Sequence, residues 1–206
     1  MSRALVLVSG GIDSAVALAW AKQNHGELAV ASFLYHLRPV RERLAVQRLL
    51  QAYPGKLIEI PVPFMRESVD LPDPIPGVPE GYISNRNLIF YSIAGHFAEV
   101  QRCETIVGGH NREDCADFPD AAASFFSRLE ALTNEALLSR NVRIELPLAA
   151  WSKRQVLERA IQWKVPLENT WSCYWDAPVP CGTCSSCAER ALAFAELGME
   201  DPLLRS

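Results

Sequence analysis

Four of the six cysteines lie within fifteen residues of one another near the C-terminus. They are spaced C-x7-C-x2-C-x2-C, as Cys173, Cys181, Cys184 and Cys187. A two-residue gap lets neighbouring thiolates bind one metal ion from a single tight turn, and the proline-containing gap after Cys173 lets the chain return to the same ion. Four thiolates leave no coordination position open, so the spacing predicts a structural tetrahedral zinc site rather than a catalytic one.

Other uses of four cysteines fit the rest of the chain less well. Two disulfides would require an oxidising compartment. Residues 1–3 instead run directly into the apolar stretch Ala4–Val8 without a signal peptide, and that stretch is too short to span a membrane. A redox pair would need only two thiols, and an iron–sulfur cluster is the main alternative. We therefore expect a cytoplasmic protein with bound zinc, in which Cys103 and Cys115 are packed apolar side chains.

The composition predicts one globular domain with a small metal-bound appendage. The chain has 206 residues, of which 49% are hydrophobic and 21% charged, so it has ample material for a core. A net charge of −4 disfavours a wide phosphate-binding surface, and we expect neither stable nucleic-acid binding nor membrane association. We assign residues 1–165 to an α/β domain and residues 166–206 to a zinc-binding segment packed on it.

Short apolar runs alternate with helical patterns along the chain. The strand-like runs are Ala4–Val8, Leu28–Leu34, Lys56–Ile60, Thr105–Gly108 and Val142–Leu146. The helical patterns are Ala15–Gln23, Arg41–Tyr53, Asn87–Arg102, Ala121–Ser139 and Ser152–Trp163, with a last helix from about Cys184 to Gly198. Continuous apolar runs are typical of parallel strands covered on both faces. The alternation therefore predicts an α/β fold, a doubly wound and mostly parallel five-stranded sheet with ligands at the carboxyl ends of its strands.

Within the helical patterns, apolar residues at steps of three and four predict the side that faces the core. The predicted stripes are Ile89, Ile93, Phe97 and Val100 in one helix and Phe125, Leu129, Leu132 and Ala136 in another. Ser152 and Gln155 have the spacing of a capping box, which predicts where the following helix begins. The segment Pro61–Gly81 is rich in proline and has no periodicity, so we interpret it as a long functional loop or lid.

The first predicted strand runs straight into Ser9-Gly-Gly-Ile-Asp-Ser14, and a helix follows. Paired glycines let the backbone approach an anion, and the N–H groups that begin a helix point at it with the helix dipole behind them. Asp13 and Ser14 could cap the helix, and Ser9 and Ser14 could donate hydroxyls to phosphate oxygens. The loop matches neither the Walker sequence nor the dinucleotide-binding glycine pattern. A plain turn with an aspartate cap is the alternative, but the position between strand and helix favours a phosphate-binding loop.

This loop is the signature of the PP-loop ATP pyrophosphatases. With the C-terminal cysteines, it resembles one of their families closely, the 7-cyano-7-deazaguanine synthases. Further matching motifs, which extend over nearly the whole chain, are Arg86-Asn87-Leu-Ile-Phe90, Asp114 through Phe118-Pro119-Asp120, Leu146-Pro147-Leu148, Trp151-Ser-Lys153, Asn169-Thr170-Trp-Ser-Cys173-Tyr174 and Cys181-Gly-x-Cys184-x-x-Cys187. The resemblance implies an adenine nucleotide α-hydrolase-like fold, with residues 1–165 as the ATP-binding domain, and an ATP-dependent C–N ligase of queuosine or other deazapurine biosynthesis.

The resemblance also implies the reaction and its residues. ATP and ammonia would convert 7-carboxy-7-deazaguanine into the 7-nitrile, preQ0, through an adenylated carboxylate and an amide. Such chemistry needs positioning and charge stabilisation at the α-phosphate, with Mg²⁺ bridging the pyrophosphate. The residues implied for catalysis are Ser9, Asp13, Arg86 and Lys153. Those implied for ATP are Val8, Ser9, Gly10, Gly11, Ile12, Asp13, Ser14 and Asn87. Those implied for the substrate are Arg38, His110, Asp114, Phe118 and Asp120, where His110 and Asp114 either contact substrate or manage the ammonia proton.

Two segments depart from the family pattern, Tyr35–Pro39 and Asp117–Ala122, and the second lacks a cysteine and an arginine that the family usually has. A paralogue that adenylates a related deazaguanine or uses another amine, in defence or DNA modification, is therefore an alternative. Others are a PP-loop tRNA-modifying enzyme, which the acidic chain disfavours, and an interaction module on an inactive fold, which the intact loop disfavours. The family's habit implies a homodimer, and its partners are small molecules: substrate, ammonia and ATP.

Overall fold

The computed structural model describes residues 2–73, 75–78 and 81–205, and these form an α/β fold around a five-stranded sheet. The strands are β1 (Arg3–Leu7), β2 (Glu27–Tyr35), β3 (Lys56–Val62), β4 (Thr105–Val107) and β5 (Arg143–Glu145). All neighbours pair in parallel, in the order β3-β2-β1-β4-β5. The predicted five-stranded doubly wound sheet is confirmed.

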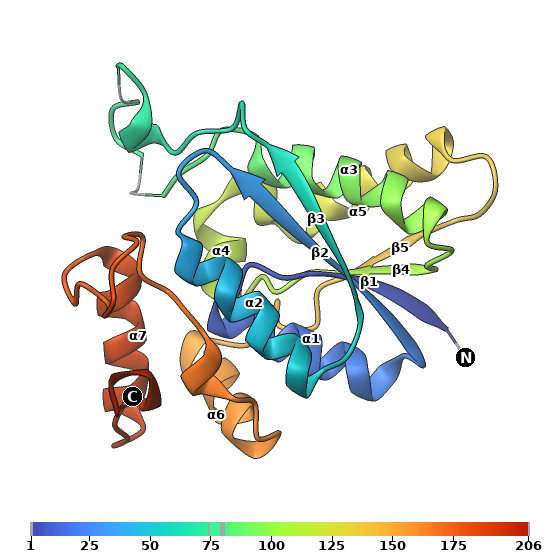
Figure 1. Ribbon diagram of the computed structural model, residues 1–206. Helices are drawn as coiled ribbons and strands as arrows, with labels where there is room; N and C mark the ends of the chain where they lie inside the picture. Colours follow the sequence, from blue (N-terminus) through green and yellow to red (C-terminus); the bar gives the residue numbers. More distant parts are fainter. Residues whose placement is uncertain (1, 74, 79–80, 206) are drawn as a thin grey trace.

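Helices cover both faces of the sheet (Figure 1). One face packs against α1 (Ile12–Asn24), α2 (Val40–Ala52) and α6 (Lys153–Gln162), and the other against α3 (Arg86–Val100) and α5 (Ala123–Ala136). Strand β1 shows the sequence basis of this arrangement. Ala4 and Val6 join the α1 face and Leu5 joins the α3 face, because successive strand side chains point to opposite sides. Both sides are buried, so the strand is continuously apolar.

The predicted helix Ala121–Ser139 is wrong at both ends. A 3₁₀ turn, η2 (Pro119–Ala121), comes first, and Ala122 is extended with φ −66° and ψ 147°. Helix α5 therefore begins at Ala123 and ends at Ala136. Its predicted stripe is only partly right, because Leu129 is buried but Leu132 is exposed.

The predicted stripe of α3 also needs correction. Val100 is exposed, and the fully buried positions of this helix include Tyr91, Ala94 and Ala98. Small side chains lie at the centre of the contact with the sheet, and the large apolar residues flank them. A periodicity read from large residues alone therefore misses the buried centre of the helix.

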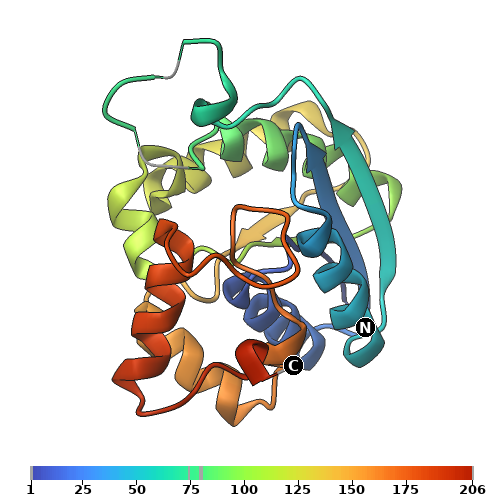
Figure 2. The same ribbon diagram turned by 60° about the vertical axis from the view of Figure 1, so that its left-hand side comes forward.

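The segment after residue 165 shares the core of the sheet. Leu167, in the turn η3 (Leu167–Asn169), and Phe194, in α7 (Ser185–Glu196), are buried with residues of β1 and α1. Arg190 of α7 is buried, pairs with both carboxylate oxygens of Asp201 at 2.6 and 2.9 Å, and donates to Thr170 Oγ1 at 2.8 Å. These bonds hold α7 and the turn η4 (Pro202–Arg205) beside the rest of the molecule (Figure 2). The division into residues 1–165 and 166–206 stays a prediction.

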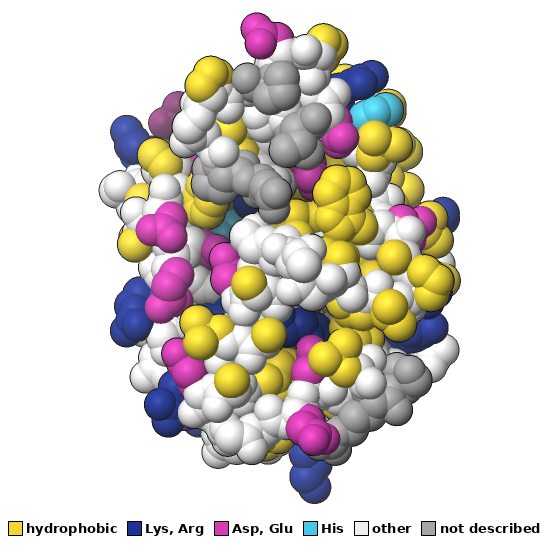
Figure 3. Space-filling model, turned by 90° about the vertical axis from the view of Figure 1, so that its left-hand side faces the viewer, with side chains coloured by type: hydrophobic (Ala, Val, Ile, Leu, Met, Phe, Trp, Pro, Cys, Tyr) yellow, Lys and Arg dark blue, Asp and Glu magenta, His cyan; other side chains and the backbone are white. Residues whose placement is uncertain are grey.

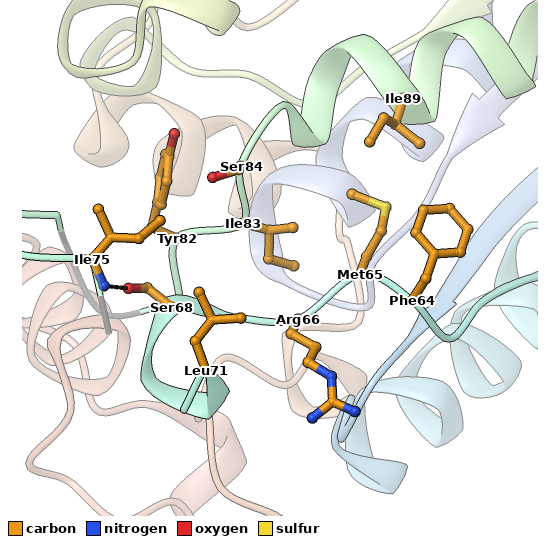
Figure 4. A pocket seen from close by; sticks show the side chains of 10 residues that line it. All are labelled: Phe64, Met65, Arg66, Ser68, Leu71, Ile75, Tyr82, Ile83, Ser84 and Ile89. Carbon is orange, nitrogen blue, oxygen red and sulfur yellow. Dashed lines mark hydrogen bonds between the residues drawn. The ribbon is translucent and has the colours of Figure 1, made fainter. Parts of the chain in front are cut away.

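The proline-rich segment leaves the sheet after Val62 and forms a 3₁₀ turn, η1 (Ser68–Asp70). With the start of α3 it surrounds a pocket of about 210 Å³ lined mainly by apolar side chains, among them Met65 and Ile89 (Figure 4). Residues 74, 79 and 80 of this segment lie outside the described part, so the predicted lid stays a prediction. None of the described helices has the length and apolar character needed to cross a membrane.

Candidate functional site: a phosphate-binding loop beside a four-cysteine site

The strand order places a crevice between the loops that follow β1 and β4. From β1 the chain proceeds outward through β2 and β3, and from β4 it proceeds the other way to β5. The connections after β1 and β4 therefore leave on opposite sides, and open α/β sheets bind ligands in the crevice at such a point. Figure 3 shows this side of the molecule, where basic and acidic side chains lie among apolar ones.

The loop after β1 has a conformation that requires glycine. Gly10 has φ +103°, and a Cβ there would lie 2.6 Å from the carbonyl oxygen of Glu42. Ser14 Oγ accepts a hydrogen bond from Gly10 N at 3.1 Å and donates to Gly11 O at 2.9 Å. The serines thus stabilise the loop, and the first-turn N–H groups of α1 have the orientation that binds phosphate.

Asp13 does not cap α1, contrary to the expectation from sequence. Gly11 is the capping residue and no side chain caps the helix. Asp13 Oδ2 instead accepts a short hydrogen bond from Lys153 Nζ, at the start of α6. Burial alone would lower the pKa of Lys153, but Asp13, Asp114 and Glu189 together raise it. The structure therefore brings two predicted catalytic residues together beside the phosphate-binding loop.

The second carboxylate oxygen of Asp13 has the environment expected of a metal ligand. Asp13 Oδ1 is buried and has no hydrogen-bond partner within the described part of the chain. A buried carboxylate oxygen without a partner is costly unless a ligand satisfies it. Mg²⁺ prefers carboxylate and phosphate oxygens, so the donor fits the predicted ion.

Two glycines after β4 complete the crevice, and sequence analysis missed them. A Cβ on Gly109 would lie 2.9 Å from the backbone of Asp13, and one on Gly108 would overlap the hydroxyl of Tyr91. Only glycine lets the β4 loop pack this closely against α1 and α3. The paired glycines after a short apolar run were the available signal.

His110 follows these glycines, and its ring lies among buried aromatic side chains. Its Nε2 lies 3.1 Å from Tyr91 Oη, and its ring centroid is 5.2 Å from that of Phe126. Burial, with Arg86 nearby, lowers the pKa of His110 to about 4. The imidazole is therefore neutral at physiological pH.

Asp114 lies in α4 (Arg112–Asp117), a short helix that was not predicted. Its Oδ2 accepts from Asn111 N at 3.1 Å and its own N–H donates to Asn111 Oδ1 at 2.9 Å, which is a capping box. Burial and the neighbouring Asp13 raise the pKa of Asp114 to about 6. The structure thus places Asp114 near Asp13 and Lys153, as a carboxyl group that titrates near neutrality.

Arg38 stabilises the loop. It donates to Ser9 O, Ser32 Oγ and Phe33 O, and it pairs with Glu42 at 3.0 Å. The side chain is 4% exposed. All these partners belong to the protein, so the predicted contact of Arg38 with substrate stays a prediction.

Asn87 and Asp120 bind each other. Asp120 Oδ2 accepts from Asn87 N at 3.2 Å, and Asn87 Nδ2 donates to Asp120 O at 3.0 Å. Asp120 therefore satisfies an N–H group at the start of α3, where Asn85 provides no cap. Phe118 packs at the edge of the same core. Their predicted ligand contacts stay predictions.

Arg86 begins α3, and its guanidinium makes no hydrogen bond or ion pair with any residue that the structure describes. Its charge opposes the rise in the pKa of Asp114, contributes to the lowered pKa of His110, and acts on a further group of titratable side chains. That group, which sequence analysis missed, consists of Tyr35, Glu42 and Glu67. Burial and repulsion from Glu42 raise the pKa of Glu67 to about 7. Arg86 thus carries an available positive charge that acts both on Asp114 and on this group.

The four cysteines predicted to bind zinc come together. Their sulfur atoms all lie within 4.8 Å of one another. The thiols also accept hydrogen bonds from backbone N–H groups: Cys173 Sγ from Trp175 and Cys181, and Cys181 Sγ from Thr183 and Cys184, at 3.3–3.4 Å. Four converging sulfur donors with N–H partners fit a tetrahedral zinc or an iron–sulfur group. The described part of the chain thus contains one four-cysteine group able to hold a metal.

The segment that carries this four-cysteine group contacts the phosphate-binding loop directly. Trp171 N donates to Gly10 O at 2.9 Å, and Trp171 is buried in one cluster with Cys173, Cys184, Cys187 and Ala45. Arg41 N donates to Asp176 Oδ1 at 3.3 Å on the same side. The four-cysteine group and the loop are therefore adjacent parts of one arrangement.

This combination of sheet, glycine loop and crevice defines the PP-loop class of α/β nucleotide-binding proteins. Two solved structures share the fold. A 4-thiouridine synthetase–RNA complex with bound ATP has a TM-score of 0.54 and 19% identity, covering 96% of this chain and 50% of that chain. The U34-tRNA thiolase NcsA from Methanococcus maripaludis, with its [4Fe-4S] cluster, has a TM-score of 0.51 and 16% identity, covering 95% and 65%.

The chain belongs to the queuosine biosynthesis protein QueC family, whose model matches residues 3–198. It is 33% identical to the 7-cyano-7-deazaguanine synthase of Nautilia profundicola over 98% of this chain and 97% of that protein. It is 34% identical to the synthase of Thermoplasma acidophilum over 98% and 91%. The resemblance inferred from the motifs is confirmed.

Proposed function

We propose that this protein makes 7-cyano-7-deazaguanine from 7-carboxy-7-deazaguanine, ammonia and ATP. The observation that carries the proposal is the pairing of Lys153 with Asp13 beside the glycine loop, in a chain of the QueC family. This arrangement supplies what adenylation needs, a phosphate-binding backbone with a cation and a carboxylate next to it. The 4-thiouridine synthetase that shares the fold holds bound ATP, which supports the same use of the loop here.

Two adenylations account for the conversion of a carboxylate into a nitrile. A carboxylate oxygen first attacks the α-phosphorus of ATP and pyrophosphate leaves. Ammonia then attacks the carboxyl carbon, AMP leaves with that oxygen, and a proton is released to give the amide. The amide oxygen attacks the α-phosphorus of a second ATP in the same way and pyrophosphate leaves. Loss of AMP with that oxygen, and of both protons from the nitrogen, then leaves the nitrile. Each step replaces a poor oxygen leaving group by AMP.

The residues of the crevice divide this work. The first-turn N–H groups of α1, with Ser9 and Ser14, bind the phosphates. Lys153 and Arg86 stabilise the negative charge that develops on the α-phosphate and pyrophosphate. Asp114 accepts a proton near neutral pH, which suits the conversion of ammonium to ammonia. Asp13 holds Lys153 in position, and its second oxygen would hold Mg²⁺, which would neutralise the charge of pyrophosphate.

The four cysteines would hold a structural zinc ion. Four thiolates would fill a tetrahedral site, so no position would be left for substrate. We also propose that the protein is a cytoplasmic homodimer. Its partners are small molecules only, and it does not bind nucleic acid stably. The acidic net charge supports the last of these.

A second candidate is a paralogue that acts on a related deazaguanine or joins another amine to the adenylated carboxylate. The segments Tyr35–Pro39 and Asp117–Ala122, which depart from the family pattern, favour it. The two candidates share the adenylation step and differ in the product.

Mass spectrometry of the products from ATP, ammonium and 7-carboxy-7-deazaguanine tests the proposal. We expect the nitrile, with two AMP and two pyrophosphate formed for each nitrile and none without the carboxylate. Asp13→Asn should abolish turnover, whereas Glu135→Gln, on the exposed side of α5, should not. Turnover that stops at the amide, or that needs another amine, would favour the second candidate. ATP hydrolysis to ADP would contradict both.

A further inference from the structure

Tyr91 is a buried residue that the proposed reaction does not use. It lies at the centre of α3, with 1% of its surface exposed, and burial raises its pKa far above the ordinary value. The phenol is therefore protonated at every physiological pH. Within residues 2–73, 75–78 and 81–205, its hydroxyl makes one hydrogen bond, to Nε2 of His110 at 3.1 Å.

Which of the two groups donates in this bond follows from the protons that each of them carries. A phenol hydroxyl has one proton, and a buried hydroxyl that donates to nothing is strongly disfavoured. His110 Nε2 is the available acceptor, so Nε2 must be unprotonated. A neutral imidazole with an unprotonated Nε2 carries its proton on Nδ1.

The surroundings of the pair support a neutral ring. Phe126 lies against both rings, with centroid distances of 4.7 Å to Tyr91 and 5.2 Å to His110. The pKa of His110 is lowered to about 4 by burial and by Arg86, with Asp13 opposing. The glycine at position 108 lets the Tyr91 hydroxyl reach the histidine, since any Cβ there would overlap it.

We infer that Tyr91 is a positioning residue that fixes His110 as the neutral Nδ1–H tautomer, so that His110 donates a hydrogen bond to an oxygen in the crevice. The inference rests on the proposed function for the identity of that oxygen, which is the carboxylate or amide oxygen of the substrate. Ammonium offers only donors, so this tautomer does not bind it through Nδ1. Of the two roles considered for His110, the structure assigns the substrate contact and leaves the ammonia proton to another group.

The tautomer is measured directly on the resting enzyme. Long-range ¹H–¹⁵N correlation spectra of protein labelled with ¹⁵N-histidine distinguish a protonated from an unprotonated ring nitrogen. We expect His110, assigned by the loss of its signals in His110→Asn, to show a protonated Nδ1 and an unprotonated Nε2 at pH 7. In Tyr91→Phe this preference should be lost, whereas Tyr53→Phe, on the opposite side of the sheet, should leave it unchanged. A protonated Nε2 or an imidazolium in the wild type would overturn the inference.

Kinetics test the role of the donor. The amide nitrogen of asparagine lies near the position of Nδ1, and that of glutamine near Nε2. We therefore expect His110→Asn to retain at least tenfold more kcat than His110→Gln, at similar thermal stability. Equal loss in both variants, or a better glutamine variant, would overturn the assigned contact. If the wild type formed no nitrile but showed the expected tautomer, the proposed function would be rejected and the role of Tyr91 would still hold.

Discussion

The backbone N–H of Trp171 donates a hydrogen bond to the carbonyl oxygen of Gly10 at 2.9 Å. Gly10 belongs to the phosphate-binding loop, and Trp171 is buried in one cluster with three of the cysteines of the four-cysteine group. The loop conformation that orients the N–H groups of α1 is therefore supported by the segment that carries the four cysteines. Metal content and ATP binding should change together.

We expect one zinc ion per chain and no iron, measured by elemental analysis of the purified protein. Cys181→Ser should lose the metal and aggregate, because a structural zinc contributes on the order of 10 kcal/mol to folding. Cys115→Ser should keep both metal and ATP affinity, since Cys115 lies outside the four-cysteine group. A folded, metal-free Cys181→Ser protein with normal ATP affinity would contradict the coupling between the two sites.

Lys153→Met should lower kcat by on the order of a hundredfold or more, because it removes a positive charge beside the phosphate-binding loop. The measured quantity is the rate of pyrophosphate release at saturating ATP. Lys22→Met, on the exposed last turn of α1, is the matched control and should leave the rate unchanged. Equal rates for the two variants would show that Lys153 only pairs with Asp13 for stability.

Arg38→Met should destabilise the protein by about 3–5 kcal/mol, because it removes the ion-pair partner of Glu42, whose side chain is only 14% exposed. It should also raise the KM for ATP, since Arg38 holds Ser9 O. Arg43→Met removes an exposed pair with Glu59 and should leave the free energy of unfolding nearly unchanged, because solvent screens such a pair. Urea unfolding gives the free energy of unfolding of both variants. A similar decrease in the two would argue against a special role of Arg38.

Asp114→Asn should make the resting enzyme more stable at alkaline pH. The folded protein holds the Asp114 proton up to about pH 6, whereas the ordinary carboxyl releases it near 3.8. Between these values the folded state binds more protons than the unfolded state, so the free energy of unfolding of the wild type falls as the pH rises. Above pH 6 the whole of this loss is present. We expect the variant to gain about 2–3 kcal/mol at pH 8 and almost nothing near pH 4. Urea unfolding at both pH values measures this. A gain in the free energy of unfolding that is the same at pH 4 and pH 8, or larger at pH 4, would contradict the prediction.

The sequence predicted those features whose residues are close together in the chain. The glycine loop, the cysteine spacing and the Ser152–Gln155 capping box each depend on contacts within a few residues, and the structure contains all three. Parallel strands followed from continuous apolar runs, because both faces of the sheet are covered.

What the sequence could not predict depends on how separate elements pack. Tyr91 resembles any apolar helix residue until Ala94 and Ala98 bring α3 close to the sheet and the hydroxyl meets His110. The six residues of α4 are too few to show periodicity. Glu42 and Glu67 lie on different elements, and only the fold makes them neighbours.

The most direct test of the account follows the substrate oxygens. With 7-carboxy-7-deazaguanine labelled by ¹⁸O at both carboxylate positions, AMP and nitrile are analysed by mass spectrometry. Two successive adenylations in the crevice predict that each AMP formed carries one ¹⁸O atom and that the nitrile carries none. Unlabelled AMP would contradict transfer of the adenylyl group to the substrate, and with it the assigned role of the loop after β1.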